Sequence, residues 1–226
     1  MKTISAIIFL ISFIIIYSKN VVIIGDSRIC GMGAYVFGFS YTYANAVYGS
    51  GSYMITNNAK NFGQYTIKLV AEVGASYVHF TNTNKEVYKG VHNILGSSQK
   101  GTMVFLWLGI NNLDSGNTFD YYRSLANKYT TLTFYVVPVT GVSSPSTITA
   151  KTIKKFNSDL KTKVNNLKLS NLKYKDILFN NDPNQIYNTD EKAITLIVTK
   201  GTTDTMGVHY DKKGYQKIFN AMVAGL

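Results

Sequence analysis

The sequence predicts an α/β protein in which a mostly parallel sheet is covered by helices on both faces. Short apolar runs rich in β-branched residues alternate along the chain with amphipathic helical patterns, and this alternation is typical of βα units. The composition is that of a globular protein, since 46% of the residues are hydrophobic and 15% are charged. The length of 226 residues suits one such domain, which we expect to occupy residues 19–226.

The first eighteen residues are interpreted as a secretory signal peptide. Lys2 is followed by an apolar run over residues 4–16, and Ile16 and Ser18 suit the −3 and −1 positions of a cleavage site. The apolar run is shorter than the roughly 18–20 residues that span a bilayer. We therefore expect cleavage after Ser18 and a secreted, extracellular protein. The alternative is a protein anchored to the membrane by this uncleaved segment.

Five segments are expected to form strands. The clearest is residues 21–24, Val-Val-Ile-Ile, which is closed by Gly25 and reads as a strand buried on both faces. Two similar apolar runs occupy residues 103–108 and 132–137, and two weaker candidates lie at residues 66–73 and 174–179.

Four further segments show apolar residues at the three- and four-residue spacing of a helix. Their apolar faces consist of Val87, Val91, Ile94 and Leu95; Phe119, Tyr122, Leu125, Ala126 and Tyr129; Ile153, Phe156, Leu160, Val164 and Leu167; and Tyr215, Ile218, Phe219, Met222 and Val223. Gly96 supplies a C-terminal stop for the first of them. Strands therefore alternate with helices through most of the chain.

Polar residues that directly follow the strands are the candidates for chemistry, because ligands of an open parallel sheet gather at the carboxyl ends of its strands. These segments are residues 25–28 (Gly-Asp-Ser-Arg), 74–76 (Gly-Ala-Ser) and 109–112 (Gly-Ile-Asn-Asn), joined by residues 207–210 (Gly-Val-His-Tyr) before the last helix. A serine hydroxyl needs a base within hydrogen-bonding reach to act as a nucleophile. Ser27 and His209 are the pair that could supply this chemistry.

Taken in order, these four blocks resemble the SGNH/GDSL hydrolase family, and the resemblance covers essentially all of residues 19–226. It implies a three-layer α/β/α sandwich with a flavodoxin-like central sheet of about five strands. It also implies Ser27 as nucleophile and His209 as its base. The oxyanion hole would consist of the backbone N–H groups of Ser27 and Gly74 and the side-chain amide of Asn111. Asp26 is expected to bond the backbone of its own loop.

The sequence departs from the family pattern before the histidine. The family has an aspartate three residues ahead of it, where this chain has Met206. An acid in this place orients the imidazole and stabilises the imidazolium. We favour Asp204 as the third catalytic residue. A Ser–His dyad with His209 held by a backbone carbonyl, a role for Asp211, and a degenerate site are the alternatives. Asn112 also replaces the usual aspartate of the third block.

The resulting hypothesis is a secreted serine ester hydrolase that works through an acyl-enzyme. The expected substrate is a small ester or an acylated glycan, which includes carbohydrate O-acetyl groups, and neither metal nor organic cofactor is implied. A catalytically silent protein of the same fold that binds carbohydrate or a cell surface is the alternative from another class. Within the hydrolases, a lipase or lysophospholipase is the alternative.

Charge and cysteine content bear on partners. Residues 1–18 contain one charged residue, Lys2, so their removal lowers the formal charge from +11 to +10, which suits an anionic cell surface. The lysines lack the interleaved aromatic residues of a nucleic-acid groove, so we expect no nucleic-acid partner, and we expect a monomer. Cys30 is the single cysteine, and we interpret it as a buried small apolar residue.

Overall fold

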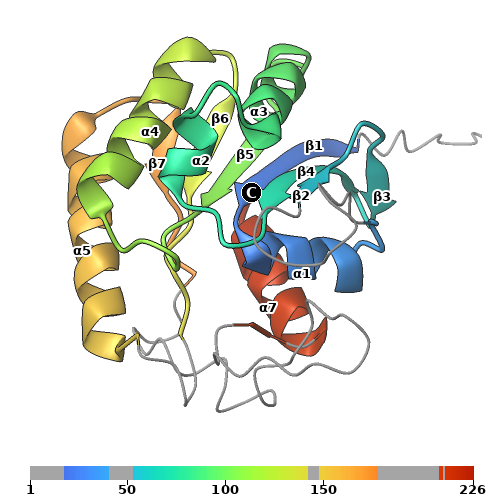
Figure 1. Cartoon of the computed structure of the whole chain (residues 1–226). Coiled ribbons are helices and arrows are strands. Elements are labelled where there is room, and N and C mark those ends of the chain that lie inside the picture. Colours follow the sequence, from blue (N-terminus) through green and yellow to red (C-terminus); the bar gives the residue numbers. More distant parts are fainter. Residues whose placement is uncertain (1–17, 41–52, 142–147, 178–208, 211) are drawn as a thin grey trace, which may run out of the picture.

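The structure is a computed structural model that describes residues 18–40, 53–141, 148–177, 209–210 and 212–226 (Figure 1). Its centre is a seven-stranded sheet in the order β2-β4-β1-β5-β6-β7, with β3 paired to β4. The strands are β1 (Lys19–Gly25), β2 (Tyr53–Ile55), β3 (Lys60–Phe62), β4 (Tyr65–Glu72), β5 (Met103–Trp107), β6 (Thr133–Val136) and β7 (Leu172–Tyr174).

Five of these strands form the parallel, flavodoxin-like sheet that was predicted. Strands β4, β1, β5, β6 and β7 pair in parallel, and in chain order this spatial sequence is second, first, third, fourth, fifth. The chain order reverses between β4 and β5, which flank β1. Ligands of such sheets bind outside the carboxyl ends of the strands at this reversal.

Helices cover both faces of the sheet and make the three layers visible in Figure 1. Helices α3, α4 and α5 pack on one face, with the short α2 beside them, and α1 and α7 pack on the other. The helices are α1 (Ser27–Tyr35), α2 (Tyr77–Thr81), α3 (Glu86–Gly96), α4 (Ser115–Lys128), α5 (Ala150–Leu167) and α7 (Lys212–Val223). The fold class predicted from the sequence is therefore confirmed.

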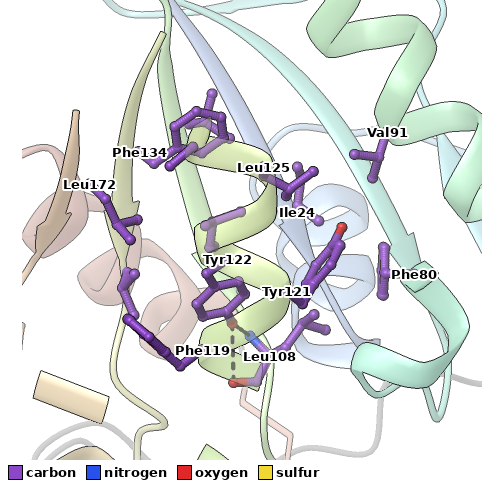
Figure 2. Packing of buried hydrophobic residues seen from close by; sticks show 14 of the residues in the cluster. Ile24, Phe80, Val91, Leu108, Phe119, Tyr121, Tyr122, Leu125, Phe134 and Leu172 are labelled. Atoms are coloured by element: carbon purple, nitrogen blue, oxygen red, sulfur yellow. Dashed lines mark hydrogen bonds between the residues drawn. The ribbon is translucent and has the colours of Figure 1, made fainter. Parts of the chain in front are cut away.

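Strand β1 shows why the sheet needs helices on both sides. Val22 and Ile24 point into the apolar cluster under α3, α4 and α5, part of which Figure 2 shows. Val21 and Ile23 belong to the opposite cluster under α1 and α7. Because alternate side chains of a strand point to opposite faces, a continuous apolar run is buried only in a sheet that is covered twice.

Two helices and two strands were not predicted. Helix α1 carries no polar face, since Ser27 to Gly33 are all buried, and so it lacks the amphipathic period that marks a surface helix. Its glycines allow this burial: a Cβ at Gly31 would lie 2.4 Å from the Tyr215 hydroxyl oxygen, and one at Gly33 would lie 2.5 Å from a methyl carbon of Leu69. Helix α2 and strands β2 and β3 are too short to show a period.

The last strand lies earlier in the chain than predicted. Residues 174–179 were expected, whereas β7 is Leu172–Tyr174, so only Tyr174 is shared, and residues 178 and 179 lie outside the described part of the chain. The strand begins earlier because buried Leu172 is the partner of Phe134 in β6. Within the described residues, the helices are all too short or too polar to cross a membrane.

Candidate active site

Ser27 lies at the carboxyl end of β1, on a sharp turn from strand to helix. Gly25 ends the strand, and a Cβ there would lie 2.6 Å from the carbonyl oxygen of Trp107, so only glycine fits this close approach. Asp26 caps α1, because its carboxylate accepts a hydrogen bond of 3.0 Å from the backbone N–H of Arg28. The turn therefore sets Ser27 as the first residue of α1, where the backbone N–H groups lack partners within the helix.

The structure brings His209 into direct contact with Ser27. The Nε2 atom of His209 lies 2.8 Å from the Oγ atom of Ser27, although 182 residues separate the two in the sequence. The distance is that of a hydrogen bond, and the serine hydroxyl is its donor when the imidazole is neutral and protonated on Nδ1. His209 is half-buried and lies just before α7, whereas Ser27 is only 5% exposed.

The acid of the proposed triad lies outside the described residues. Asp204, Asp211 and Met206 all fall in the parts of the chain that the structure does not describe, so the prediction of Asp204 stays a prediction. The carboxylate that the structure does describe near this pair is Asp26, which is 2% exposed. Burial raises the pKa of Asp26 to about 6, against the opposing effect of the positive charges of Arg28 and His209.

The two loops predicted to supply oxyanion donors meet at the same end of the sheet. Gly74 lies in the turn after β4 with a φ of +74°, a conformation that favours glycine. Asn111 follows β5, and its side-chain Nδ2 donates a hydrogen bond of 2.9 Å to the carbonyl oxygen of Ala75. An amide NH₂ carries two hydrogens, and this bond uses one of them. Asn111 is thereby tied to the residue that follows Gly74.

Glycine and tyrosine residues fix the course of the chain between β5 and Asn111. Gly109 has a φ of +136°, and a Cβ there would lie 2.7 Å from the ring of Phe156. The hydroxyl of Tyr122 on α4 accepts a hydrogen bond of 2.9 Å from the backbone N–H of Leu108, as the dashed line in Figure 2 shows. Tyr122 is fully buried. Its role is more specific than the apolar helix position that the periodicity predicts.

Three residues beside the site were not assigned a role from the sequence: Arg28, Thr140 and Tyr210. All three are at most 2% exposed. The sequence held one signal for Arg28: a charged residue in the first turn after a buried strand is expected to need hydrogen-bond partners inside the protein.

Cys30 is buried with 0% exposure, as expected, and burial raises the pKa of its thiol well above the usual value. Among the described residues, no group of three or more His, Cys, Asp or Glu is arranged to hold a metal ion.

The sequence matches no protein-family model and no curated protein. Its structure is similar to solved structures over most of the chain. A member of the lipolytic G-D-S-L family from Veillonella parvula has 14% identity and a TM-score of 0.55, covering 92% of this chain and 98% of its own. A mutant of Axe2, an acetyl-xylooligosaccharide esterase from Geobacillus Stearmophilus, has 14% identity and a TM-score of 0.55, with coverages of 92% and 95%.

A family 3 carbohydrate esterase from Clostridium thermocellum is also similar, with 16% identity, a TM-score of 0.50 and coverages of 90% and 92%. At these low identities, the likeness establishes the fold of the chain and leaves the chemistry to its own residues.

Proposed function

We propose that this chain, which has the fold of the SGNH/GDSL hydrolases, is a serine ester hydrolase with Ser27 as nucleophile and His209 as general base. The observation that carries the proposal is the 2.8 Å contact between Ser27 Oγ and His209 Nε2 at the carboxyl end of the sheet. A base within hydrogen-bonding reach of the serine hydroxyl is the arrangement that nucleophilic catalysis requires. The solved structures with this fold include proteins named as esterases, which agrees with the proposal.

The reaction follows from this geometry. Ser27 Oγ attacks the ester carbonyl carbon while its proton passes to His209 Nε2, and the carbonyl oxygen becomes an oxyanion. The oxyanion is stabilised by the N–H groups of Ser27 and Gly74 and by the side-chain amide of Asn111. The intermediate then expels the alcohol, which takes the proton from His209, and leaves an acyl group on Ser27. Water repeats the cycle with His209 as base and releases the acid.

The third catalytic residue in this proposal is Asp204. A carboxylate that accepts from Nδ1 would hold the imidazole in the tautomer that can take the proton from Ser27. Replacing Asp204 with alanine should lower kcat by about 10³–10⁴-fold, whereas Asp211→Ala should change it little. If both variants retain wild-type kcat, a dyad without a carboxylate is the better description of the site.

The substrate class we propose is an acylated carbohydrate, with an O-acetyl group as the acyl part. Two of the similar structures are named as acetyl-xylooligosaccharide esterase and carbohydrate esterase, which supports this class. A formal charge of +10 for residues 19–226 also favours work at an anionic cell surface. Release of acetate from acetylated xylo-oligosaccharides, compared with release of fatty acid from phospholipid, tests this class against the lipase alternative.

Export is part of the proposal. Strand β1 begins at Lys19, so cleavage after Ser18 would leave the whole of the described sheet intact. The N-terminal sequence of protein secreted by an expressing cell tests this directly. A start at Lys19 supports export by a cleaved signal peptide, and intact residues 1–18 in the membrane fraction favour the anchor.

The decisive experiment measures hydrolysis of p-nitrophenyl acetate and longer-chain esters by the purified protein. Ser27→Ala and His209→Ala should each abolish activity above background, because either change removes a bond-making group. Ser124→Ala, at an exposed serine of α4, and His92→Gln, in α3, are the matched controls and should retain activity. If the wild type is no faster than the two active-site variants on esters and acetylated glycans, the silent carbohydrate-binding alternative is favoured.

A further inference from the structure

Arg28, the residue after the proposed nucleophile, carries a buried positive charge. Its side chain is 1% exposed, and a guanidinium out of water is costly unless its N–H groups are bonded. Nη1 donates to the carbonyl oxygen of Thr140 at 3.1 Å and to its Oγ1 at 3.2 Å, and Nη2 donates to the carbonyl oxygen of Gly141 at 3.2 Å. The guanidinium thus ties the start of α1 to the loop that follows β6.

The same guanidinium packs against two aromatic rings. Its Cζ lies 5.8 Å from the ring centroid of Trp107 and 5.2 Å from that of Tyr210, distances at which a cation is attracted to a ring face. Trp107 is the last residue of β5, from which the chain continues to Asn111. Tyr210 directly follows His209. One side chain therefore touches the segments that carry all the described site residues except Gly74.

Tyr210 is held at both of its ends. The ring lies near the guanidinium, and the hydroxyl oxygen lies 2.5 Å from Thr140 Oγ1 and donates to the carbonyl oxygen of Gly141. The side chain is 2% exposed. Arg28 and Tyr210 therefore converge on the same two residues after β6.

The loop after β6 is itself fixed to α5. The side-chain amide of buried Asn157 accepts from the backbone N–H of Val139 and donates to its carbonyl oxygen, each at 2.8 Å. An amide side chain thus bonds both backbone groups of Val139, as a neighbouring strand would. Asn157 thus anchors the residue directly before Thr140 and Gly141, which are the two residues that Arg28 and Tyr210 both contact.

We propose that Arg28 and Tyr210 are positioning residues that hold His209 at bonding distance from Ser27. The inference rests on the proposed function for its catalytic meaning. His209 lies outside the described strands, and its neighbour Tyr210 makes side-chain contacts to Arg28 and Thr140 that help to fix this part of the chain. At 1% exposure, Arg28 acts through Tyr210 rather than on the substrate. A lysine could not bond two carbonyl oxygens with a planar fork or lie between two rings in the same way.

The test uses Arg28→Lys and Tyr210→Phe in the purified full-length protein. We expect kcat to fall by about 10²-fold in Arg28→Lys and about tenfold in Tyr210→Phe, with KM changed less than about twofold, because a small misplacement of a catalytic group is costly. The double variant should lose little more than Arg28→Lys alone, because both residues act through one contact. The matched controls are Arg123→Lys, at a half-exposed arginine of α4, and Tyr121→Phe, at a buried tyrosine of α4. Both should retain wild-type kcat.

A spectroscopic measurement separates positioning from stability and does not need turnover. The chain has three histidines, so the imidazole nitrogens of ¹⁵N-histidine-labelled protein can be assigned with His209→Ala as reference. In the wild type, His209 should show one fixed tautomer with Nε2 as acceptor, and Ser27→Ala should shift that signal. In Arg28→Lys and Tyr210→Phe, the two nitrogen signals should move towards those of a free imidazole.

Each outcome bears on one proposal or the other. If the wild type is inactive but the His209 signals respond to Arg28→Lys and Tyr210→Phe as expected, the positioning role stands and the hydrolase proposal fails. If the signals and kcat of both variants match the wild type while circular dichroism shows native folding, the positioning role is overturned. Should Arg28→Lys fail to fold, Tyr210→Phe decides the question, because it removes only one oxygen atom.

Discussion

The two walls of the site are built in different ways. On one side, the Gly74 and Asn111 loops leave β4 and β5, the two neighbours of β1, and are joined by a single neutral hydrogen bond to Ala75. On the other side, His209 precedes α7 and lies next to a tyrosine packed against a buried guanidinium. We call the loops of Gly74 and Asn111 the donor wall, and the segment of His209 and Tyr210 the base wall. The position of the donor wall is set by the strands that its loops leave, whereas the position of the base wall depends on the buried charge of Arg28.

The difference follows from where each wall begins in the chain. A loop that leaves a strand of the central sheet is already placed to within a residue or two by the backbone ladder, so one local bond completes it. The base is separated from Ser27 by 182 residues, and His209 itself lies outside the described strands. Hydrogen bonds from a buried charged group are strong and directional, and so they can fix the position of such a segment.

A large loss of activity is expected at the donor wall. Asn111→Ala removes a proposed donor to the oxyanion and should lower kcat by about 10²–10³-fold with little change in KM. Asn112→Ala, at the exposed neighbouring asparagine, is the control and should stay near wild type. Steady-state kinetics on p-nitrophenyl acetate measure both. A fall for Asn112→Ala instead would move the donor to that residue.

The next effect concerns the stability of the turn at Gly109, which leads from β5 to Asn111. Gly109→Ala should destabilise the fold by about 2–4 kcal/mol, because the left-handed φ is strained and the added Cβ would meet the Phe156 ring. Gly101→Ala shares a positive φ of +84° but meets nothing within 4 Å, so it should cost only about 1 kcal/mol. Urea denaturation measures both. Equal losses of unfolding free energy would mean that backbone strain, rather than the contact with Phe156, accounts for the cost of Gly109→Ala.

Asp26, the residue before Ser27, gives a pH-dependent comparison. Its pKa is raised to about 6, so its contribution to stability is full below about pH 4 and is lost as the pH rises through 6. Asp26→Asn keeps the helix cap and removes the charge. The variant should therefore gain about 2–3 kcal/mol relative to the wild type between pH 4 and pH 8.

Urea unfolding of wild type and Asp26→Asn across that range measures the difference. A variant that instead becomes progressively less stable than the wild type as the pH rises would show that the Asp26 carboxylate is needed to balance the charge of Arg28.

The smallest effect concerns the tyrosine behind the donor wall. Tyr122→Phe leaves the buried N–H of Leu108 without its acceptor and should cost about 1–3 kcal/mol in unfolding free energy. Tyr121→Phe is the control, because the Tyr121 hydroxyl has no hydrogen-bond partner in the described structure. Thermal unfolding compares them. A larger loss for Tyr121→Phe would contradict the role given to Tyr122.

The sequence predicted those parts of the molecule that depend on local sequence patterns. Continuous apolar runs such as residues 21–24 predicted central strands, and polar residues directly after such runs indicated the loops of Ser27 and Asn111. Helix α1 was missed because a helix buried on all sides has no polar face to set a period. Arg28 and Tyr210 were not assigned a role because their value lies in contacts with Thr140, more than 65 residues from either of them, and no local pattern encodes such a pairing.

Cys30 provides a natural thiol whose rate of chemical labelling can report on opening of the core around α1. It is the single cysteine of the chain, it has 0% exposure, and it lies one turn from Ser27 on the same helix. A thiol reagent can reach it only when the packing around it opens, so the labelling rate measures how often the core around the helix of the proposed nucleophile opens. The opening free energy of the site can thus be followed in every variant above, without a substrate and without adding a probe to the protein.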